Sequence, residues 1–397
     1  MTGFAESVIH VDMDAFFVEV ERLRDPRLVS RPVVVGGAGR RGVVASASYE
    51  SRRFGVRSAM PMSVARRLCP GLVVVPTDHD EYQRVSELVF EIFRDFTPIV
   101  EGLSLDEAFL DVAGLRRLFD HPVEIGHSLR QRLRAELGLP ASVGIASTKF
   151  VAKLASEAAK PDGLTHIPGP ETLTFLHALP VRSLWGVGEA THASLESLGV
   201  DTVGDLAALD ILMLAARLGV SSGNHLAALA RGEDARRVVP DAAAKSISVS
   251  ETYDTDITSR ERVDTELLRL CDRLGHRMRR SGLAGRTISL KVRYSDFTTI
   301  SRSVTLADPT HNSREIRHAV GLLTPKVDWT RPVRLLGVEV GTLAEPGSPR
   351  QLTTEEPEKW QELSDTVDQI RDRYGSAAIG PARLTPVDKN RSTTSPD

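Results

Sequence analysis

Apolar and polar positions over roughly the first 170 residues predict strands and helices that alternate irregularly. Short β-branched runs predict strands, and one stretch alternates like a hairpin; these lie at 7–12, 31–37, 42–50, 71–78, 99–112 (the hairpin) and 141–147. Apolar residues at helical spacing predict helices at 15–23, 61–70, 80–96, 123–138 and 148–163. Because there is no strict strand–helix–strand repeat, we expect an α+β fold around a sheet.

The remaining chain divides into three further stretches. Residues 170–235 are helical with short loops, and the polar, Pro/Ala-containing segment that follows predicts a linker. Residues 246–343 return to strands and helices, including a long arginine-rich helix. The last fifty or so residues are polar, with one amphipathic helix near 357–375 and an end, 388–397, whose composition predicts disorder.

Composition places the chain among globular proteins of a reducing compartment. Its 397 residues suffice for two to four domains, and 41% are hydrophobic and 26% charged. Cys69 and Cys271 cannot form a disulfide framework or a C-x-x-C metal site, so we expect a cytoplasmic protein. Acidic residues appear early, beginning with Glu6, which argues against a signal peptide, and no apolar stretch is long enough to span a bilayer.

The charge distribution leaves nucleic-acid binding open. A formal net charge of −3 argues mildly against it, since phosphate binding requires Lys and Arg. Residues 260–293, however, hold nine arginines and Lys291. Such a run is either a solvated helix face or a phosphate-contacting surface, and the run alone does not decide between them.

Acidic side chains interrupt two apolar runs. Asp12 ends the first predicted strand and Asp14 follows it by two residues, and Asp106 and Glu107 lie inside the predicted hairpin. Neighbours in a regular strand point to opposite faces, so Asp106 and Glu107 share a site only at a strand end or hairpin tip. If the hairpin pairs beside the first strand, the carboxylates of Asp12, Asp106 and Glu107 converge. Their charges would repel one another strongly unless cations neutralise them. Hard divalent ions suit such ligands, and two of them ~3.5–4 Å apart can assist phosphoryl transfer. The alternative is that the acids face solvent.

Candidate phosphate-binding side chains follow. Tyr49, Arg52 and Arg53 come after a strand of small residues, and arginine suits bidentate phosphate contact. Lys160 lies at a predicted helix end, where a solvated surface lysine is the alternative.

Five separated motifs carry a resemblance to a known family. "VDMDAFF", "ASYESRRFGVRSAMP", "SLDEAFLD", "GIASTKFVAKLASEAAKPDG" and "LWGVG" resemble, in order and spacing, those of Y-family DNA polymerases, most closely the DNA polymerase IV branch. The resemblance covers about residues 5–345. It implies a right-hand polymerase with these parts: palm at 1–23 and 79–168, fingers at 24–78, a thumb with a helix-hairpin-helix at 169–235, a linker at 236–245, a DNA-binding little finger at 246–345, and a polar tail at 346–397.

The resemblance also implies roles for individual residues. Asp12, Asp106 and Glu107 match the catalytic, metal-binding carboxylates, and the Met13 carbonyl matches a further ligand of two Mg²⁺ ions, for which Mn²⁺ substitutes. Tyr49, Arg52 and Lys160 match the triphosphate-binding side chains, and Phe17 matches the steric gate against ribose. Phe16 either stacks beneath the sugar or packs in the core. Asp14 matches an acid that is not a ligand, and we expect it to cap the following turn.

The implied reaction is attack of a primer 3′-OH on a dNTP in low-fidelity translesion synthesis. The implied partners are primer-template DNA and dNTP, and the chain is expected to be a monomer. Gly186 and Gly188 would let backbone N–H groups approach DNA phosphate, with an ordinary turn between helices as the alternative. The usual sliding-clamp peptide is degraded at Gln351–Glu355, where Thr354 and Glu355 replace apolar anchors, so clamp binding is doubtful.

Two other functions are weighed against a polymerase. A palm-type nucleotidyl cyclase would use similar carboxylates and metals but leaves the helix-hairpin-helix unexplained. A non-catalytic DNA-binding scaffold would make the acids dispensable, yet all three are present.

Overall fold

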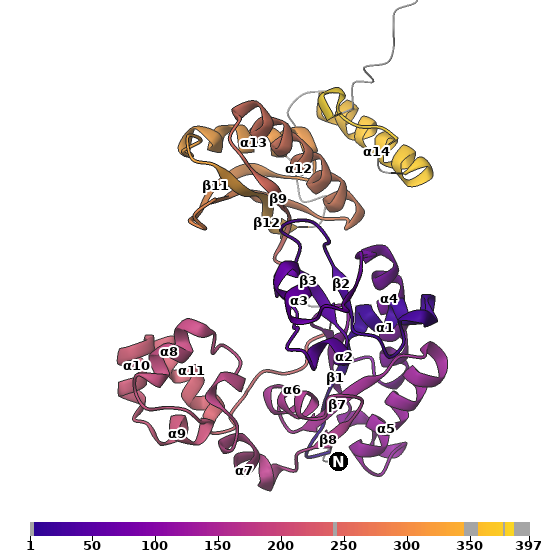
Figure 1. Ribbon diagram of the computed structural model, residues 1–397, viewed down its shortest axis with the longest axis vertical. Coiled ribbons are helices and arrows are strands. Elements are labelled where there is room, and N and C mark those ends of the chain that lie inside the picture. The colour runs from indigo at the N-terminus through magenta and orange to yellow at the C-terminus, as the bar shows by residue number, and fades with distance from the viewer. Residues whose placement is uncertain (1–3, 241–243, 345–355, 376–377, 385–397) are drawn as a thin grey trace, which may run out of the picture. The chain divides into compact units, whose positions relative to one another are not determined.

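The computed structural model describes residues 4–240, 244–344, 356–375 and 378–384. The chain forms two compact units, residues 1–242 and 243–397 (Figure 1). The degraded clamp peptide at Gln351–Glu355 and the end of the chain at 388–397 lie outside the described residues.

A five-stranded sheet is the centre of the first unit. Its strand order is β5-β6-β1-β7-β8, with every neighbour antiparallel except the parallel pair β7 and β8. The strands are β1 (Val8–Met13), β5 (Val100–Gly102), β6 (Glu107–Asp111), β7 (Ala141–Ala146) and β8 (Leu164–His166). The expected hairpin is therefore β5–β6, and β6 pairs with β1 as the convergence of the acids requires.

The two faces of this sheet are covered by different helices. Ile9, Val11 and Met13 of β1 enter a core with α4 and α5, whereas His10 and Asp12 point to the opposite face, where α6 packs. The helices are α1 (Phe16–Arg24), α4 (His79–Phe96), α5 (Pro122–Arg132) and α6 (Lys149–Ala158). A Cβ on Gly144 of β7 would lie 2.0 Å from the Ala152 carbonyl oxygen, so glycine is what lets α6 approach the sheet.

Residues 24–78 form a smaller layer inserted after α1. Its three strands are ordered β3-β2-β4, and they pack with the second of two helices around their own apolar cluster. These elements are β2 (Val33–Gly36), β3 (Val44–Ala47), α2 (Tyr49–Arg52), α3 (Met62–Leu68) and β4 (Val73–Val75). The strand expected over 42–50 is shorter than its sequence pattern, because the Ser48 hydroxyl accepts from the Ser51 N–H and starts α2 there.

Five short helices follow and share a core with α6. They are α7 (Thr172–His177), α8 (Glu189–Glu196), α9 (Val203–Ala208), α10 (Ile211–Leu218) and α11 (Val220–Ala230). The chain then runs past the first sheet, where the Glu101 carboxylate accepts from the Val239 N–H and binds Lys149. The predicted linker is thus anchored at its start.

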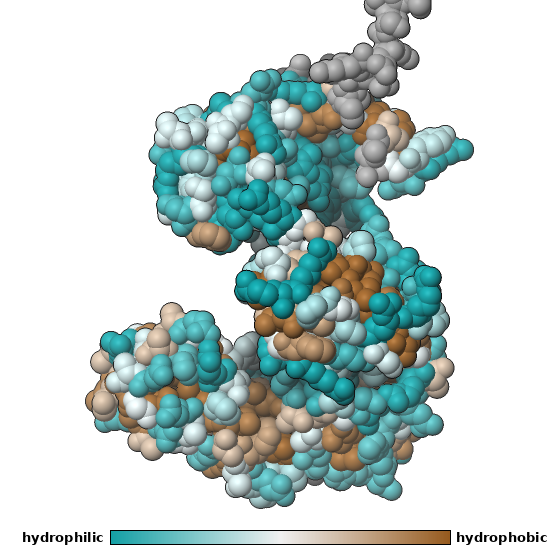
Figure 2. Space-filling view, in the orientation of Figure 1, coloured by the Kyte–Doolittle hydropathy of each residue, from teal (hydrophilic) through white to brown (hydrophobic). Residues whose placement is uncertain are grey.

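The second unit is a four-stranded antiparallel sheet, ordered β11-β10-β12-β9, with α12 and α13 on one face (Figure 1). Its elements are β9 (Ser246–Ile257), α12 (Arg260–Arg280), β10 (Ala284–Tyr294), β11 (Thr299–Thr310), α13 (Ser313–Leu323) and β12 (Val333–Ala344). The last helix, α14 (Glu356–Tyr374), docks on α12 through Asp368, which binds Arg279 and His276. The visible surface of this unit is mostly hydrophilic (Figure 2).

Short helical turns complete the described chain. They lie at Pro26–Leu28, Ala113–Arg117, Leu133–Leu137, Gly169–Glu171, Val181–Ser183, Thr324–Lys326 and Ala382–Leu384. Within the described residues, every helix is too short or too polar to cross a membrane.

Candidate active site

The predicted carboxylates lie together on the face of the first sheet that α6 covers. Asp12 of β1 is directly opposite Glu107 of β6 in the antiparallel register. Asp106 precedes the first residue of β6, and its carbonyl accepts from the Met13 N–H at 2.9 Å. Asp106 therefore lies at a strand end, the position from which it can share a site with Glu107.

Two lysines and a serine contact these acids. Lys160 Nζ is 2.7 Å from Asp12 Oδ2, Lys153 Nζ of α6 contacts Glu107 Oε2, and the Ser104 hydroxyl donates to Asp106. The acids are sheltered, with the Asp12 and Glu107 side chains 17% and 22% exposed. Each carboxylate thus has its own polar partner within the protein.

The pKa values of the three acids shift in different directions because the surroundings of the carboxyl groups differ. Burial raises the pKa of Asp12 to about 6 although Lys160 opposes the shift, and the charges of Asp106 and Glu107 raise it further. Burial also raises the pKa of Asp106. His10 and Lys153 outweigh burial at Glu107 and lower its pKa to about 2. Carboxylates whose charges oppose one another's ionisation favour the binding of a cation.

The ligand atoms that these residues offer are of the chemical type that a divalent cation prefers. Three carboxylates provide the hard oxygen ligands that Mg²⁺ and similar ions prefer. In the described part of the chain, no three His, Cys, Asp or Glu side chains are already arranged around one ion position. Lys153 and Lys160 occupy the carboxylates instead, so these lysines would have to withdraw when an ion binds.

Asp14 does not cap the following turn as expected. Helix α1 begins after Ala15 with no side-chain cap, because the Asp14 carboxylate is 2% exposed and engaged elsewhere. It accepts from the Tyr49 hydroxyl, from the Ser142 hydroxyl at 3.0 Å and from the Asp162 N–H at 2.8 Å. Asp14 therefore joins the inserted layer to the turn that follows Lys160.

That junction gathers the predicted triphosphate-binding residues. Tyr49 begins α2, and the Arg52 guanidinium lies 4.6 Å from the centre of the Tyr49 ring. Arg52 Nε also donates to the Ala47 carbonyl at 3.0 Å. Burial and then the bond to Asp14 raise the pKa of Tyr49, which keeps the phenol protonated as a donor. Lys160 reaches Asp12 from the other side.

The two phenylalanines differ in their surroundings. Phe16 is 2% exposed in the core, which agrees with the second of its two expected roles. Phe17 is half-buried, and its ring stacks on Tyr82 of α4 with centroids 4.3 Å apart and planes at 13°. The Tyr82 hydroxyl donates to Glu21 at 2.8 Å, so the ring beneath Phe17 is held in place.

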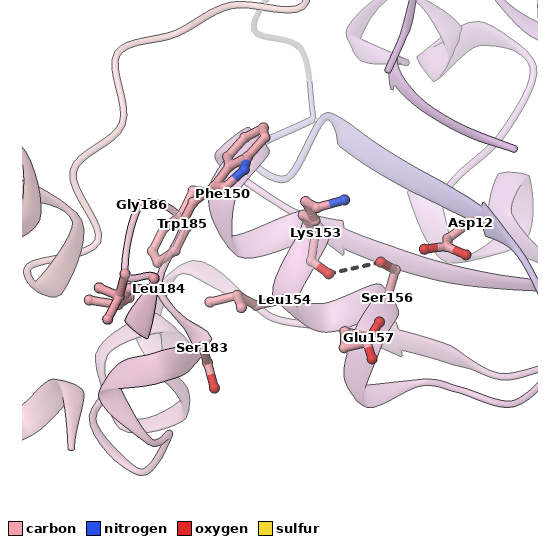
Figure 3. A pocket seen from close by; sticks show the side chains of 12 residues that line it. Asp12, Phe150, Lys153, Leu154, Ser156, Glu157, Ser183, Leu184, Trp185 and Gly186 are labelled. Atoms are coloured by element: carbon pink, nitrogen blue, oxygen red, sulfur yellow. Dashed lines mark hydrogen bonds between the residues drawn. The ribbon is translucent and has the colours of Figure 1, made fainter. Parts of the chain in front are cut away.

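A cavity of about 480 Å³ opens beside Asp12. Figure 3 shows Lys153 and Glu157 of α6 and Trp185 around it. The same cavity is lined by Gly186 and Gly188, which precede α8. A Cβ at either glycine would meet nothing within 4 Å, so this backbone is open to a ligand.

Sequence reasoning missed several residues of this site. His10 is fully buried, and its Nδ1 and Ser156 Oγ form a hydrogen bond of 2.7 Å while its Nε2 lies 3.5 Å from Glu107. Lys153 had a readable signal, because it lies seven residues before Lys160 and therefore on the same side of the predicted helix. No sequence signal points to Tyr82, because its contact with Phe17 joins segments that are distant in the sequence.

Comparisons with known proteins match the chain to a family. Family models match three segments: the impB/mucB/samB family at residues 11–157, its C-terminal domain at 244–354, and the thumb domain of DNA polymerase-iota at 182–234. DNA polymerase IV of Desulfatibacillum aliphaticivorans is 46% identical, over 95% of this chain and 96% of that protein. DNA polymerase IV of Streptomyces coelicolor is 48% identical, over 86% and 72% respectively.

A solved Y-family DNA polymerase chimera of Dbh and Dpo4 has the same fold. Its TM-score is 0.77 at 24% identity, covering 85% of this chain and 99% of that one. The chain therefore belongs to the Y family of DNA polymerases, in the DNA polymerase IV branch. It is a DNA-directed DNA polymerase of translesion synthesis that acts on primer-template DNA and dNTPs, and membership of the family implies dependence on divalent metal ions.

Proposed function

We propose that Asp12, Asp106 and Glu107 carry the polymerase chemistry of this chain. The observation that supports this proposal is the direct opposition of Asp12 and Glu107 on paired strands, with Asp106 at the adjoining strand end. The reaction is addition of a dNTP to a primer 3′-OH, with pyrophosphate as the second product. Neither rival accounts for the whole chain, since a cyclase needs no DNA-binding unit and a scaffold needs no carboxylates.

The three carboxylates and the Met13 carbonyl would hold two Mg²⁺ ions, with Mn²⁺ as a substitute. Such ions stabilise charge on the attacking and leaving oxygens. The protein supplies the positions: Tyr49 and Arg52 bind the triphosphate from one side and Lys160 from the other. Asp14 joins Tyr49, on which Arg52 stacks, to the turn at Asp162 that follows Lys160. Lys160 then exchanges its bond with Asp12 for one with phosphate.

Phe17 is the proposed steric gate. It lies five residues after Asp12, at the start of α1, so the short turn between strand and helix fixes the offset of its ring from the carboxylates. Stacking on Tyr82 resists displacement of the ring by a ribose 2′-OH.

DNA is proposed to contact both units through its phosphates. In the first unit, the open backbone at Gly186 and Gly188 suits a phosphate at the start of α8. In the second, the sheet face opposite α12 presents Lys291 and Arg293 among small hydroxyl side chains, whereas Val292 between them is buried in the core. These contacts carry no sequence preference, as a polymerase requires.

Low fidelity is proposed to follow from an open covering of the nascent base pair. The resemblance to Y-family polymerases matches Val43 and Ala45 to the positions over that pair, and both residues are small and exposed. A base pair that is loosely covered is checked only weakly for its shape, so mismatches are rejected poorly.

We also propose that the chain is a monomer and that it binds the sliding clamp little through Gln351–Glu355.

The proposal is tested by Asp106→Ala, with the exposed acid Asp120→Ala as the matched control. We expect Asp106→Ala to reduce primer extension with Mg²⁺ to background while primer-template affinity stays near wild type, because carboxylates hold the ions and other groups hold the phosphates. The control should extend normally. Near wild-type extension by Asp106→Ala would refute the assignment.

A further inference from the structure

The hairpin between β10 and β11 places a phenylalanine in an unfavourable backbone conformation. The turn is closed by the Tyr294 N–H, which donates to the Thr298 carbonyl at 2.9 Å. Within it, Phe297 has φ of +66°, in the left-handed region. Glycine and asparagine adopt this region at low cost, whereas a bulky side chain does not.

The fold gains little from this ring. Phe297 is 61% exposed, while Tyr294 at the base of the same hairpin is 1% exposed and supplies the apolar packing. A strained residue that buries little apolar surface is typical of a functional position. The ring is therefore a candidate contact for a ligand.

An arginine against the ring, and a second at the base of the hairpin, indicate the chemistry of that ligand. The Arg334 guanidinium lies 4.6 Å from the centre of the Phe297 ring. Arg331 lies 3.9 Å from the Tyr294 ring centre and pairs with Asp296 at 2.6 Å. A planar aromatic ring next to cations is the surface on which nucleic-acid bases stack, with the cations near the phosphates.

We propose that Phe297, backed by Arg334, is a stacking platform for an unpaired base of single-stranded DNA. This inference rests on the proposed function, which supplies DNA as substrate, and adds to it a contact with a base rather than with the backbone. Stacking needs a free base face, so the platform acts on the single-stranded part of the template and not on paired DNA.

The test compares Phe297→Asn with Phe297→Tyr in the full chain. Asparagine suits the left-handed backbone and removes the ring, whereas tyrosine keeps the ring. Leu118→Asn is the matched control, because Leu118 is 76% exposed and follows the end of β6 remote from Asp106. Affinity is measured at fixed salt for a primer-template with a single-stranded overhang and for a blunt duplex, and 2-aminopurine placed along the overhang reports stacking.

We expect Phe297→Asn to weaken overhang binding about fivefold or more and to abolish 2-aminopurine quenching. Blunt-duplex affinity and the melting temperature should not fall, and Phe297→Tyr and Leu118→Asn should match wild type. Unchanged overhang binding, an equal loss on the blunt duplex, or a lowered melting temperature in Phe297→Asn would each overturn the platform. A wild-type chain that neither binds DNA nor extends primers would instead overturn the proposed function.

Discussion

At the scale of single residues, the site depends on side chains held by neighbours that are distant in sequence. Phe17 is an example, because its ring rests on Tyr82, which Glu21 holds through a hydrogen bond of 2.8 Å. A ring that cannot move aside is a better barrier than a free one. The proposed gate therefore owes its rigidity to a residue of α4, outside the motif that predicts it.

Phe17→Ala should raise rNTP incorporation relative to dNTP by well over about tenfold, the factor that 1.4 kcal/mol represents. The 2′-OH would no longer meet the ring or lose hydrogen bonds to water, a cost of about 1–3 kcal/mol. Single-turnover insertion of dCTP and rCTP opposite template G measures the ratio. If Phe17 only packs the core, stability and both activities fall together and the ratio stays the same.

Asp14 gives a second prediction at this scale. Asp14→Ala leaves the Asp162 N–H and the Tyr49 hydroxyl without their acceptor, so we expect a loss of about 1–3 kcal/mol in the free energy of unfolding. We also expect weaker dNTP binding, because Tyr49 and the turn after Lys160 are no longer joined. Denaturant titration and the dNTP dependence of single-turnover extension measure the two effects. Ser142→Ala removes one donor only and should cost less; equal costs would contradict the central role of Asp14.

At the scale of elements, what the sequence could predict depended on how local the signal was. The acids at Asp12, Asp106 and Glu107 were readable because charges interrupt apolar runs, and the pairing of β1 with β6 brings them together. The role of Asp14 was not readable, since its partners Ser142 and Asp162 lie 128 and 148 residues further along the chain.

The arginine-rich segment shows the same limit. Its pattern allowed a solvated helix face or a phosphate-contacting surface. In the structure most of it is α12, where Arg269 and Arg273 pair with Glu251. Only the part that enters β10 reaches the open face of the sheet, and that division depends on strand register rather than on composition.

Docking of α14 should depend on Asp368. Burial raises the pKa of this carboxyl, but bonds from Arg279 and His276 outweigh burial and lower it. A lowered folded-state pKa stabilises the docked helix above the ordinary value of about 4, and this stabilisation is lost as pH falls through the folded-state pKa. At pH 7, Asp368→Asn should speed hydrogen exchange in α14 but not in the core of α12.

The exposed Asp372→Asn is the control for this change and should leave exchange in α14 unaltered. The difference in stability between wild type and Asp368→Asn should also shrink as pH falls from about 4 through the lowered folded-state pKa, where the wild-type carboxyl becomes protonated. A difference that persists at low pH would show that the pairing with Arg279 and His276 does not hold the helix.

At the scale of the whole molecule, a net charge of −3 is compatible with DNA binding because basic residues are present locally, as Lys291 and Arg293 are on β10. Contacts with phosphate release counterions, so affinity for primer-template DNA should fall steeply between about 50 and 200 mM salt. Lys291→Ala and Arg293→Ala should each reduce the slope of log affinity against log salt by about 1, because each removes one phosphate contact from the open sheet face.

Arg280, an exposed residue at the end of α12, provides the matched control, and Arg280→Ala should leave the slope unchanged. If the helix and sheet variants lowered the slope equally, the sheet face would not be the specific DNA-contacting surface. A slope that none of the three variants changes would show that these residues of the second unit do not contact phosphate.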